Sequence, residues 1–186
     1  PTTDYDGFYI KRRFYFMGRW IKHGGYYPTR LLRLFRNGKG RVEREVNEHV
    51  VVDGKVGYLK NDFADYNRKP IIAWLEKHVK YAEMEAELLV KQKGEVDNWR
   101  LFEDFIKGTP ERKKKWLRYK VYNRMPPLIR PFLFFAYRYF IRLGFMDGKE
   151  GFIYHFLQGL WFPFIVDLFY LEKKLFKSER EIGNRR

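Results

Sequence analysis

The chain contains no cysteine among its 186 residues. This absence excludes a disulfide scaffold, a thiolate metal site and a thiol nucleophile. The chain also lacks any window of about 18 residues that is free of charge, so a simple membrane-spanning helix is not indicated. The longest charge-free stretch of this kind, residues 151–166, is interrupted by His155, Gln158 and Pro163.

Acidic residues are few compared with basic ones: 23 Asp and Glu stand against 38 Lys and Arg, which gives a net charge of +15. Nucleic acids and anionic lipids are the two common polyanions that such a balance attracts. The basic residues alternate with long aromatic and aliphatic stretches, and this pattern favours a membrane surface. The chain has no zinc pattern, ribonucleoprotein signature or recognition helix, so we expect no nucleic-acid partner.

What the chain has in plenty is aromatic residues, at 20% of the sequence, within a hydrophobic fraction of 45%. These fractions predict a folded protein, and the succession of β-rich and helical patterns along the chain predicts a mixed α/β class. The pattern divides the chain into a β-rich region (residues 1–68), a helical and basic connecting region (69–125), aromatic amphipathic helices at a membrane interface (126–176) and a polar tail (177–186).

Turn signals and periodicity place the elements more closely. Asp53-Gly54 between two apolar runs predicts a β-hairpin within residues 44–62. Apolar residues at spacings of three and four predict a helix from Ile71 that ends near Gly94. Further helices are expected at residues 98–107, after Pro110, at 131–143 and at 149–175.

The first strand of the predicted hairpin carries the consecutive polar residues Asn47, Glu48 and His49. A carboxylate that is held near such groups at the end of a strand could act as a general base. The plainer interpretation is an exposed carboxylate on a strand, and the residues alone do not decide against it.

A loop with two consecutive glycines, His23-Gly24-Gly25-Tyr26-Tyr27-Pro28, precedes Arg30, Arg33 and Arg36. One interpretation is a backbone that approaches a phosphorylated ligand closely, with guanidinium groups to bind it. The other is a flexible turn with solvated arginines. Two further features have plain interpretations: Asp4 and Asp6 as the polar start of the first strand, and His78 as a packed histidine on an apolar helix face.

Several residues are candidates for contact with lipid headgroups, because they lie in the most aromatic part of the chain. Basic side chains in an apolar helix can extend to the headgroups, and aromatic rings are favoured at the interface. The candidates are Arg130, Arg138, Arg142, Trp161 and Phe162.

Two long segments carry a resemblance. The segment "FMGRWIKHGGYYPTRLLRLFRNGKGRVEREVNEHVVVDGKVGYLKNDFADYNRKPIIAWLEKHVKYAEMEA" resembles the C-terminal half of bacterial family-2 glycosyltransferases, which assemble lipopolysaccharide and exopolysaccharide. The segment "RPFLFFAYRYFIRLGFMDGKEGFIYHFLQGLWF" resembles their membrane-associated helices. The resemblance implies the C-terminal, acceptor-side part of a GT-A fold with β-hairpins, followed by amphipathic helices.

The resemblance also implies an inverting transfer from a nucleotide-sugar donor to a lipid-linked or polysaccharide acceptor. Glu48 matches the family's base, whereas Asn47 stands where the family commonly has His. Trp20, His23, Gly24, Gly25, Arg30, Arg33, Arg36, Asn47 and His49 would then lie near the substrates. The implied location is the cytoplasmic face of the bacterial inner membrane, with the protein peripheral or monotopic.

The family's nucleotide-binding half precedes these motifs, and it carries the D-x-D ligands of a divalent metal, Mg²⁺ or Mn²⁺. We therefore expect the chain to be the C-terminal part of an enzyme, with no metal ligands of its own and inactive alone. The alternative is a non-catalytic basic module that binds a membrane or a partner.

Overall fold

The structure is a computed structural model that describes residues 4–42, 50–92 and 122–183. The strands are β1 (Gly7–Phe16), β2 (Arg19–Trp20), β3 (Thr29–Phe35), β4 (Gly40–Val42), β5 (Val50–Val52) and β6 (Val56–Asn67). The helices are α1 (Ile71–Gln92), η1 (Tyr122–Arg124), α4 (Arg130–Ala136), η2 (Tyr137–Ile141), η3 (Gly144–Asp147), α5 (Gly148–Phe156), η4 (Leu157–Trp161) and α6 (Phe162–Gly183). The mixed α/β class that the sequence pattern predicts is confirmed.

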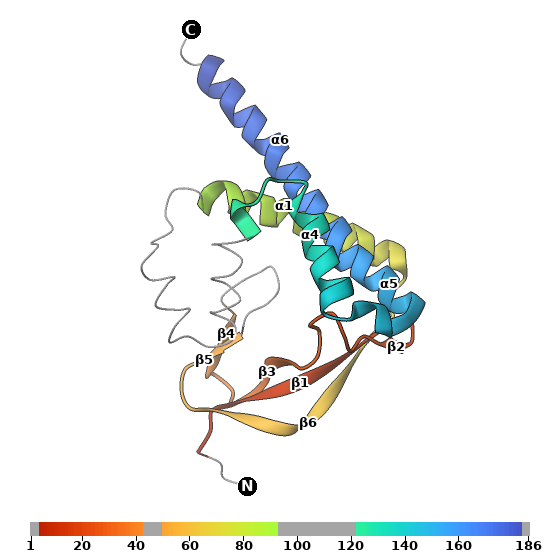
Figure 1. The fold of residues 1–186 in the computed structure, drawn as a ribbon. Helices are drawn as coiled ribbons and strands as arrows, with labels where there is room; N and C mark the ends of the chain where they lie inside the picture. Colours follow the sequence, from red (N-terminus) through yellow and green to blue (C-terminus); the bar gives the residue numbers. More distant parts are fainter. Residues whose placement is uncertain (1–3, 43–49, 93–121, 184–186) are drawn as a thin grey trace. The chain divides into compact units, whose positions relative to one another are not determined.

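The chain forms two compact units, one of residues 1–74 and 135–157, the other of residues 75–134 and 158–186. The first unit is built on β1, which is central in a four-stranded sheet (Figure 1). Strand β6 pairs with β1 in parallel along one edge, from Gly7↔Val56 to Phe16↔Asn67. The antiparallel strands β3 and β2 share the other edge, β3 beside residues 7–12 and β2 beside residues 15–16.

The predicted hairpin around Asp53-Gly54 is wrong in its pairing. Strand β5 pairs with β4 in a separate two-stranded sheet, and β6 joins β1 instead. Asp6 fixes the turn between β5 and β6. Its backbone N–H donates to the Lys55 carbonyl at 2.7 Å, and its carboxylate accepts from the Lys55 N–H at 3.1 Å. The carboxylate lies so close to Gly54 that a Cβ there would be 2.1 Å from it. Asp6 therefore has the plain structural role expected at the start of β1.

The two faces of β1 differ because side chains alternate along a strand. On one face Phe16, which is 2% exposed, forms the core of the first unit with Ile21 and Tyr154, and Phe14, Tyr26 and Leu157 pack against this core. On the other face the neighbouring positions are Lys11, Arg13 and Tyr15, which are partly exposed. The apolar face thus joins the sheet to α5, and the polar face is left open.

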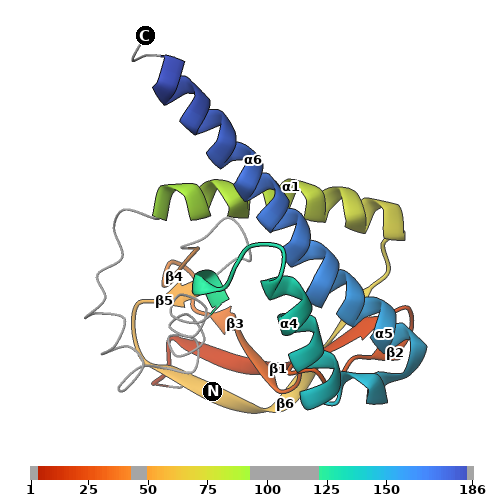
Figure 2. The ribbon, with the colours of Figure 1, turned by 45° about the horizontal axis from the view of Figure 1, so that its top comes forward.

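The second unit contains most of α1 and all of α6, which cross each other (Figure 2). The side-chain amide of Gln158 donates to His78 Nε2 at 2.8 Å, and the Phe162 ring meets the His78 ring edge-on. Lys173 of α6 forms ion pairs with Glu83 and Glu87 of α1, at 3.6 and 3.1 Å. His78 is therefore a packed histidine, as its place on an apolar helix face predicts.

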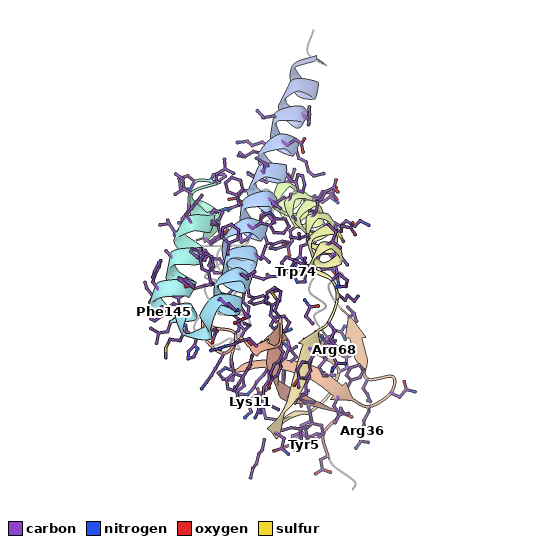
Figure 3. The ribbon with its side chains drawn as sticks, turned by 90° about the vertical axis from the view of Figure 1, so that its right-hand side faces the viewer. Tyr5, Lys11, Arg36, Arg68, Trp74 and Phe145 are labelled. Atoms are coloured by element: carbon purple, nitrogen blue, oxygen red, sulfur yellow. The ribbon has the colours of Figure 1, made fainter. Side chains whose placement is uncertain are left out.

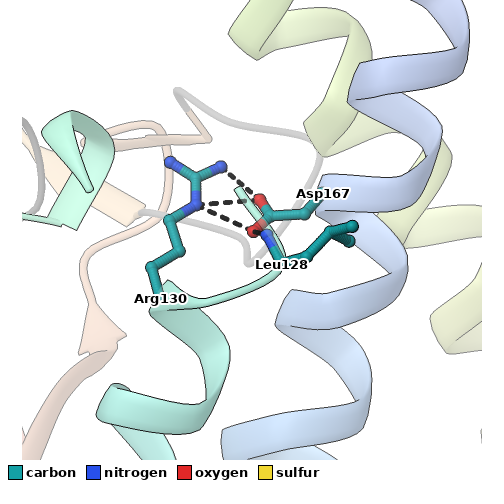
Figure 4. Close-up of polar contacts among 3 residues, drawn as sticks. All are labelled: Leu128, Arg130 and Asp167. Carbon is teal, nitrogen blue, oxygen red and sulfur yellow. Dashed lines mark hydrogen bonds and ion pairs between the residues drawn. The ribbon is translucent and has the colours of Figure 1, made fainter. Parts of the chain in front are cut away.

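A buried ion pair joins the start of α4 to α6 in the second unit (Figure 4). Arg130 Nε donates to both carboxylate oxygens of Asp167 at 2.9 Å, and the Leu128 N–H donates to the same carboxylate at 2.9 Å. The side chains of Arg130 and Asp167 are only 4% and 1% exposed. This corrects the expectation that Arg130 contacts lipid headgroups, because its guanidinium is enclosed by protein.

The predicted helices at 131–143 and 149–175 correspond to α4 with η2 and to α5 through α6. The stretch Gly144–Phe176 is long and apolar enough to associate with a membrane, with a mean hydropathy of 1.3 over its most apolar window. Only 28% of that window is buried in protein, which is less than the core helix of a soluble protein would show. The helices predicted at 98–107 and after Pro110 lie outside the described residues.

Candidate functional site: an anchored glycine loop beside an open groove

The loop between β2 and β3 has a backbone that only glycine adopts easily. Gly24 and Gly25 have φ angles of +66° and +81°, in the left-handed region that side chains disfavour. The Tyr27–Pro28 peptide bond is cis, and the Thr29 hydroxyl donates to the Tyr26 carbonyl at 2.6 Å. The motif "HGGYYPT" is therefore an ordered turn in which the two glycines have a conformational reason.

Helical residues 138–155 hold this loop from one side. The Gly24 N–H donates to the Arg142 carbonyl at 2.8 Å, and Arg138 Nε donates to the Gly24 carbonyl at 2.8 Å. The His155 ring, which is fully buried, lies against Gly24 so closely that a Cβ would be 1.9 Å from its Cε1 atom. Gly24 is thus required by the space available as well as by its φ angle.

His23 is fixed by Asp147. The carboxylate of Asp147 accepts from the His23 backbone N–H at 2.9 Å and lies 2.6 Å from His23 Nδ1. His155 Nε2 is 3.7 Å away, too far for a hydrogen bond but close enough for an electrostatic interaction. Burial alone would raise the pKa of Asp147, but the interactions with His155 and His23 outweigh it and lower the pKa.

Tyr26 connects the loop to the core. Its ring centroid lies 4.8 Å from that of Tyr154, and the Arg138 guanidinium carbon is 3.8 Å from the Tyr26 centroid. Burial raises the pKa of the Tyr26 hydroxyl, so this side chain stays neutral at physiological pH. The side chains of His23 and Tyr26 and the backbone of Gly24 are therefore held in place.

An open groove of about 520 Å³ lies on the polar face of the β1–β6 pair. Figure 3 labels Lys11 on this sheet and Arg68 just after β6. The groove is lined by Lys11, Arg13, Tyr15, Tyr27, Lys60, Asn61, Asp62, Ala64 and Tyr66. Its volume is within the roughly 300–1,000 Å³ of small-molecule sites, and its lining is far more polar than usual.

Asp62 organises the groove. Its carboxylate lies 3.0 Å from Lys11 Nζ and accepts hydrogen bonds from Arg13 Nε and the Tyr27 hydroxyl, each at 2.8 Å. The hydrogen bond from Arg13 is the main reason that the pKa of Asp62 is lowered to about 2, with Lys11 and Tyr27 also contributing. Asp62 is therefore ionised throughout the physiological pH range.

The loop reaches the groove through Tyr27, whose hydroxyl binds Asp62. Trp20 meets the Tyr27 ring edge-on, with centroids 5.1 Å apart. The guanidinium of Arg13 lies 5.2 Å from the centre of the Trp20 ring, and Lys22 Nζ lies 5.6 Å from it. The anchored loop and the groove are therefore two parts of one site within the first unit.

The substrate-binding residues that the sequence predicts are only partly brought together. Trp20, His23, Gly24 and Gly25 gather at the loop, and Arg30 lies over the Tyr58 ring beside the groove. Arg33 is exposed on β3, and Arg36 binds the Tyr5 carbonyl at 3.2 Å, away from the loop. Asn47, Glu48 and His49 lie outside the described residues, so the predicted catalytic base stays a prediction.

Sequence reasoning missed Lys11, Arg13, Asp62 and Tyr66, and it placed Tyr27 in the candidate loop without a role of its own. The signal was available as period-two alternation in "KRRFYF" and "KNDFADY", which places Lys11, Arg13 and Tyr15 on one face and Asp62, Ala64 and Tyr66 on one face. The alternation does not predict the parallel pairing that places β1 beside β6.

Of the residues predicted at a membrane interface, Arg138 and Arg142 belong to the loop anchor. Arg138 contacts Gly24 and Tyr26 through its side chain, and Arg142 binds Gly24 through its backbone carbonyl. The Arg142 side chain itself is exposed, whereas Trp161 and Phe162 are half-buried in the second unit. Arg138 therefore has a structural role that its sequence context did not predict.

Among the described residues, no three Asp, Glu or His side chains converge as a set of metal ligands. The divalent metal implied by the resemblance therefore has no binding residues to name in this part of the chain. No family model matches the chain, and no solved structure matches it.

Proposed function

We propose that the chain is the acceptor-side region of an inverting glycosyltransferase that works at a membrane surface. In this proposal Glu48 takes the proton from an acceptor hydroxyl while that oxygen attacks the anomeric carbon of the donor sugar. The bond from the anomeric carbon to the nucleoside diphosphate breaks, and the diphosphate leaves with the bonding electrons. A divalent metal, when bound, would neutralise charge on the leaving diphosphate.

One observation carries the proposal. The loop that the resemblance assigns to substrate binding, residues 23–28, is held in a fixed conformation and opens onto a groove rich in hydroxyl, amide and charged groups. A transferase needs such rigidity, because a misplacement of about 1 Å in a positioned substrate can cost a hundredfold in rate.

Exposed apolar side chains support the membrane part of the proposal. Within the first unit, Phe140 and Ile141 of η2 are 60% and 72% exposed, and Phe145 and Met146 of η3 are 49% and 52% exposed. Phe152, Ile153 and Phe156 of α5 are also exposed, at 45%, 36% and 40%. Such a set of apolar side chains, with exposed cations such as Arg142 and Lys149 nearby in the chain, suits shallow insertion into an anionic membrane.

The test is Glu48→Gln in the natural protein that carries this chain. General-base catalysis contributes about 10²–10⁴ in rate, so sugar transfer from a radiolabelled nucleotide sugar to membrane acceptors should fall by at least about 100-fold. Glu45→Gln, three residues earlier, makes the same chemical change and should leave transfer intact. Transfer by Glu48→Gln at the level of the unmodified protein would overturn the proposal.

The exposed apolar side chains also fit the alternative function, a non-catalytic module that binds membranes. The two functions differ in the natural protein: the module binds vesicles that contain phosphatidylglycerol but transfers no sugar from any nucleotide sugar. A Phe140→Asp variant should weaken vesicle binding under either function, so only the transfer assay separates them.

A further inference from the structure

The groove on the polar face of β1 and β6 has a charge that points to an anionic ligand. Lys11, Arg13 and Lys60 contribute three positive charges, and Asp62 removes one. Lys60 is exposed and has no ion-pair partner among the described residues. The groove therefore carries two uncompensated positive charges, at least one of them on a side chain that is free to bind.

The neutral polar groups of the groove indicate that the ligand also carries hydroxyl groups. A carboxylate has about four acceptor positions, two on each oxygen. In Asp62, Oδ2 accepts from Arg13 and Tyr27, and Oδ1 lies 3.0 Å from Lys11 Nζ. The side chain is only 5% exposed, so Asp62 positions these three groups and is not itself open to a ligand. A ligand hydroxyl can instead bind the exposed side-chain amide of Asn61, which offers a donor and an acceptor, and the hydroxyl of Tyr66, which is 52% exposed.

The aromatic residues argue against stacked bases. The Tyr15 and Tyr66 rings stack on each other, with centroids 4.3 Å apart, as do the rings of Tyr9 and Tyr58 at 5.3 Å. Arg68 lies over the Tyr66 ring and Arg30 over the Tyr58 ring. Proteins that bind single-stranded nucleic acid need open ring faces on which bases can stack. The Tyr66 and Tyr58 rings each have a stacked tyrosine and an arginine against them, so these two rings offer mainly their edges and hydroxyls.

We propose that this groove binds an anionic saccharide, a sugar that carries a phosphate or carboxylate group. Lys60 and Lys11 bind the anionic group, while Asn61 and Tyr66 bind the sugar hydroxyls. Tyr27 joins this groove to the anchored loop, so the bound sugar lies next to residues 23–28. The binding needs neither Glu48 nor a transfer reaction, so it stands or fails independently of the proposed enzyme activity.

The test is isothermal titration calorimetry on the 186-residue chain at low salt, where electrostatic binding is strongest. Trigalacturonic acid and glucose 6-phosphate are the two probes, one for each source of the anionic group. We expect at least one of them to bind, and to bind more tightly than maltotriose, which lacks the charge, and inorganic phosphate, which lacks the sugar.

A matched pair of variants locates the binding. Lys60→Ala removes a free cation from the groove and should weaken binding by about tenfold, in line with the loss of one charge-assisted hydrogen bond. Lys39→Ala removes the same charge from the exposed turn between β3 and β4 and should leave the affinity within about twofold. Both side chains are exposed, so neither variant should change the melting temperature appreciably.

Four outcomes would overturn the proposal. The first is no binding of either probe, and the second is equal binding of inorganic phosphate. The third is tighter binding of a ten-residue oligouridylate that competes with the sugars, which would make the groove a nucleic-acid site. The fourth is equal weakening by Lys39→Ala and Lys60→Ala, which would show an effect of net charge alone. Loss of sugar transfer in Glu48→Gln would change none of these binding measurements.

Discussion

The two faces of β1 show how one strand serves two purposes. Phe14 and Phe16 point toward Tyr154 and the core, whereas Lys11, Arg13 and Tyr15 point into an open groove. Both faces contact the same loop, because Tyr26 packs into the core and Tyr27 binds Asp62 in the groove. The packed face therefore fixes the loop, and the open face is where that fixed loop can meet a ligand.

The largest expected effect is on the packed face. Phe16→Ala removes a ring that is 2% exposed, and it should lower the free energy of unfolding by about 3–5 kcal/mol. Tyr15→Ala, on the next residue and the open face, should cost about 1 kcal/mol through loss of its stack with Tyr66. Urea unfolding of both variants measures the difference, and equal losses would contradict the distinction between the faces.

A smaller effect is expected from the two glycines of the loop. Gly25→Ala should cost about 1–2 kcal/mol, because φ is +81° but the nearest atom to a new Cβ, on Arg142, is 3.7 Å away. Gly24→Ala has the same conformational cost, and its new Cβ would also clash with the His155 ring. This variant should therefore be clearly the more destabilising of the two. Thermal unfolding of the two variants compares their losses of stability. A larger loss for Gly25→Ala would mean that the His155 ring does not restrict the space at Gly24.

The smallest expected effect concerns pH and the groove. The pKa of Asp62 is about 2 in the folded protein against an ordinary value of 3.8. Because the folded pKa is the lower one, its contribution to stability is fully present above about pH 4 and is lost as the pH falls through about 2. Asp62→Asn should therefore be less stable than the unmodified chain at pH 5, and the gap should narrow by pH 2. A gap that stays constant between pH 5 and pH 2 would show that the ionised carboxylate is not the cause.

Much of the fold could be predicted from the sequence where the signal is local. The helix from Ile71 and the aromatic helices after Arg130 follow from periodicity, and the glycine loop follows from residues that tolerate positive φ angles. The plain role of Asp6 was also predictable, because the residue stands directly before a strand.

The sequence failed where partners are distant along the chain. Asp53-Gly54 suggested a hairpin, but the alternation in residues 56–67 suits any partner strand, and β1 competes successfully for β6. Arg130 suggested headgroup contact, because nothing near it in the sequence points to Asp167, 37 residues away. The contact of Arg138 with Gly24 could not be predicted for the same reason, since the two residues are 114 positions apart.

The central claim is that the open face of β1, and not the packed face, receives a sugar ligand. The most direct measurement is a ¹³C–¹H NMR titration of the tyrosine rings with trigalacturonic acid or glucose 6-phosphate, whichever binds more tightly. The account predicts shifts for Tyr15 and Tyr66 in the groove, with Tyr26 and Tyr154 in the core unchanged. Shifts confined to Tyr26 and Tyr154, or no ring shifts at saturating ligand, would contradict it.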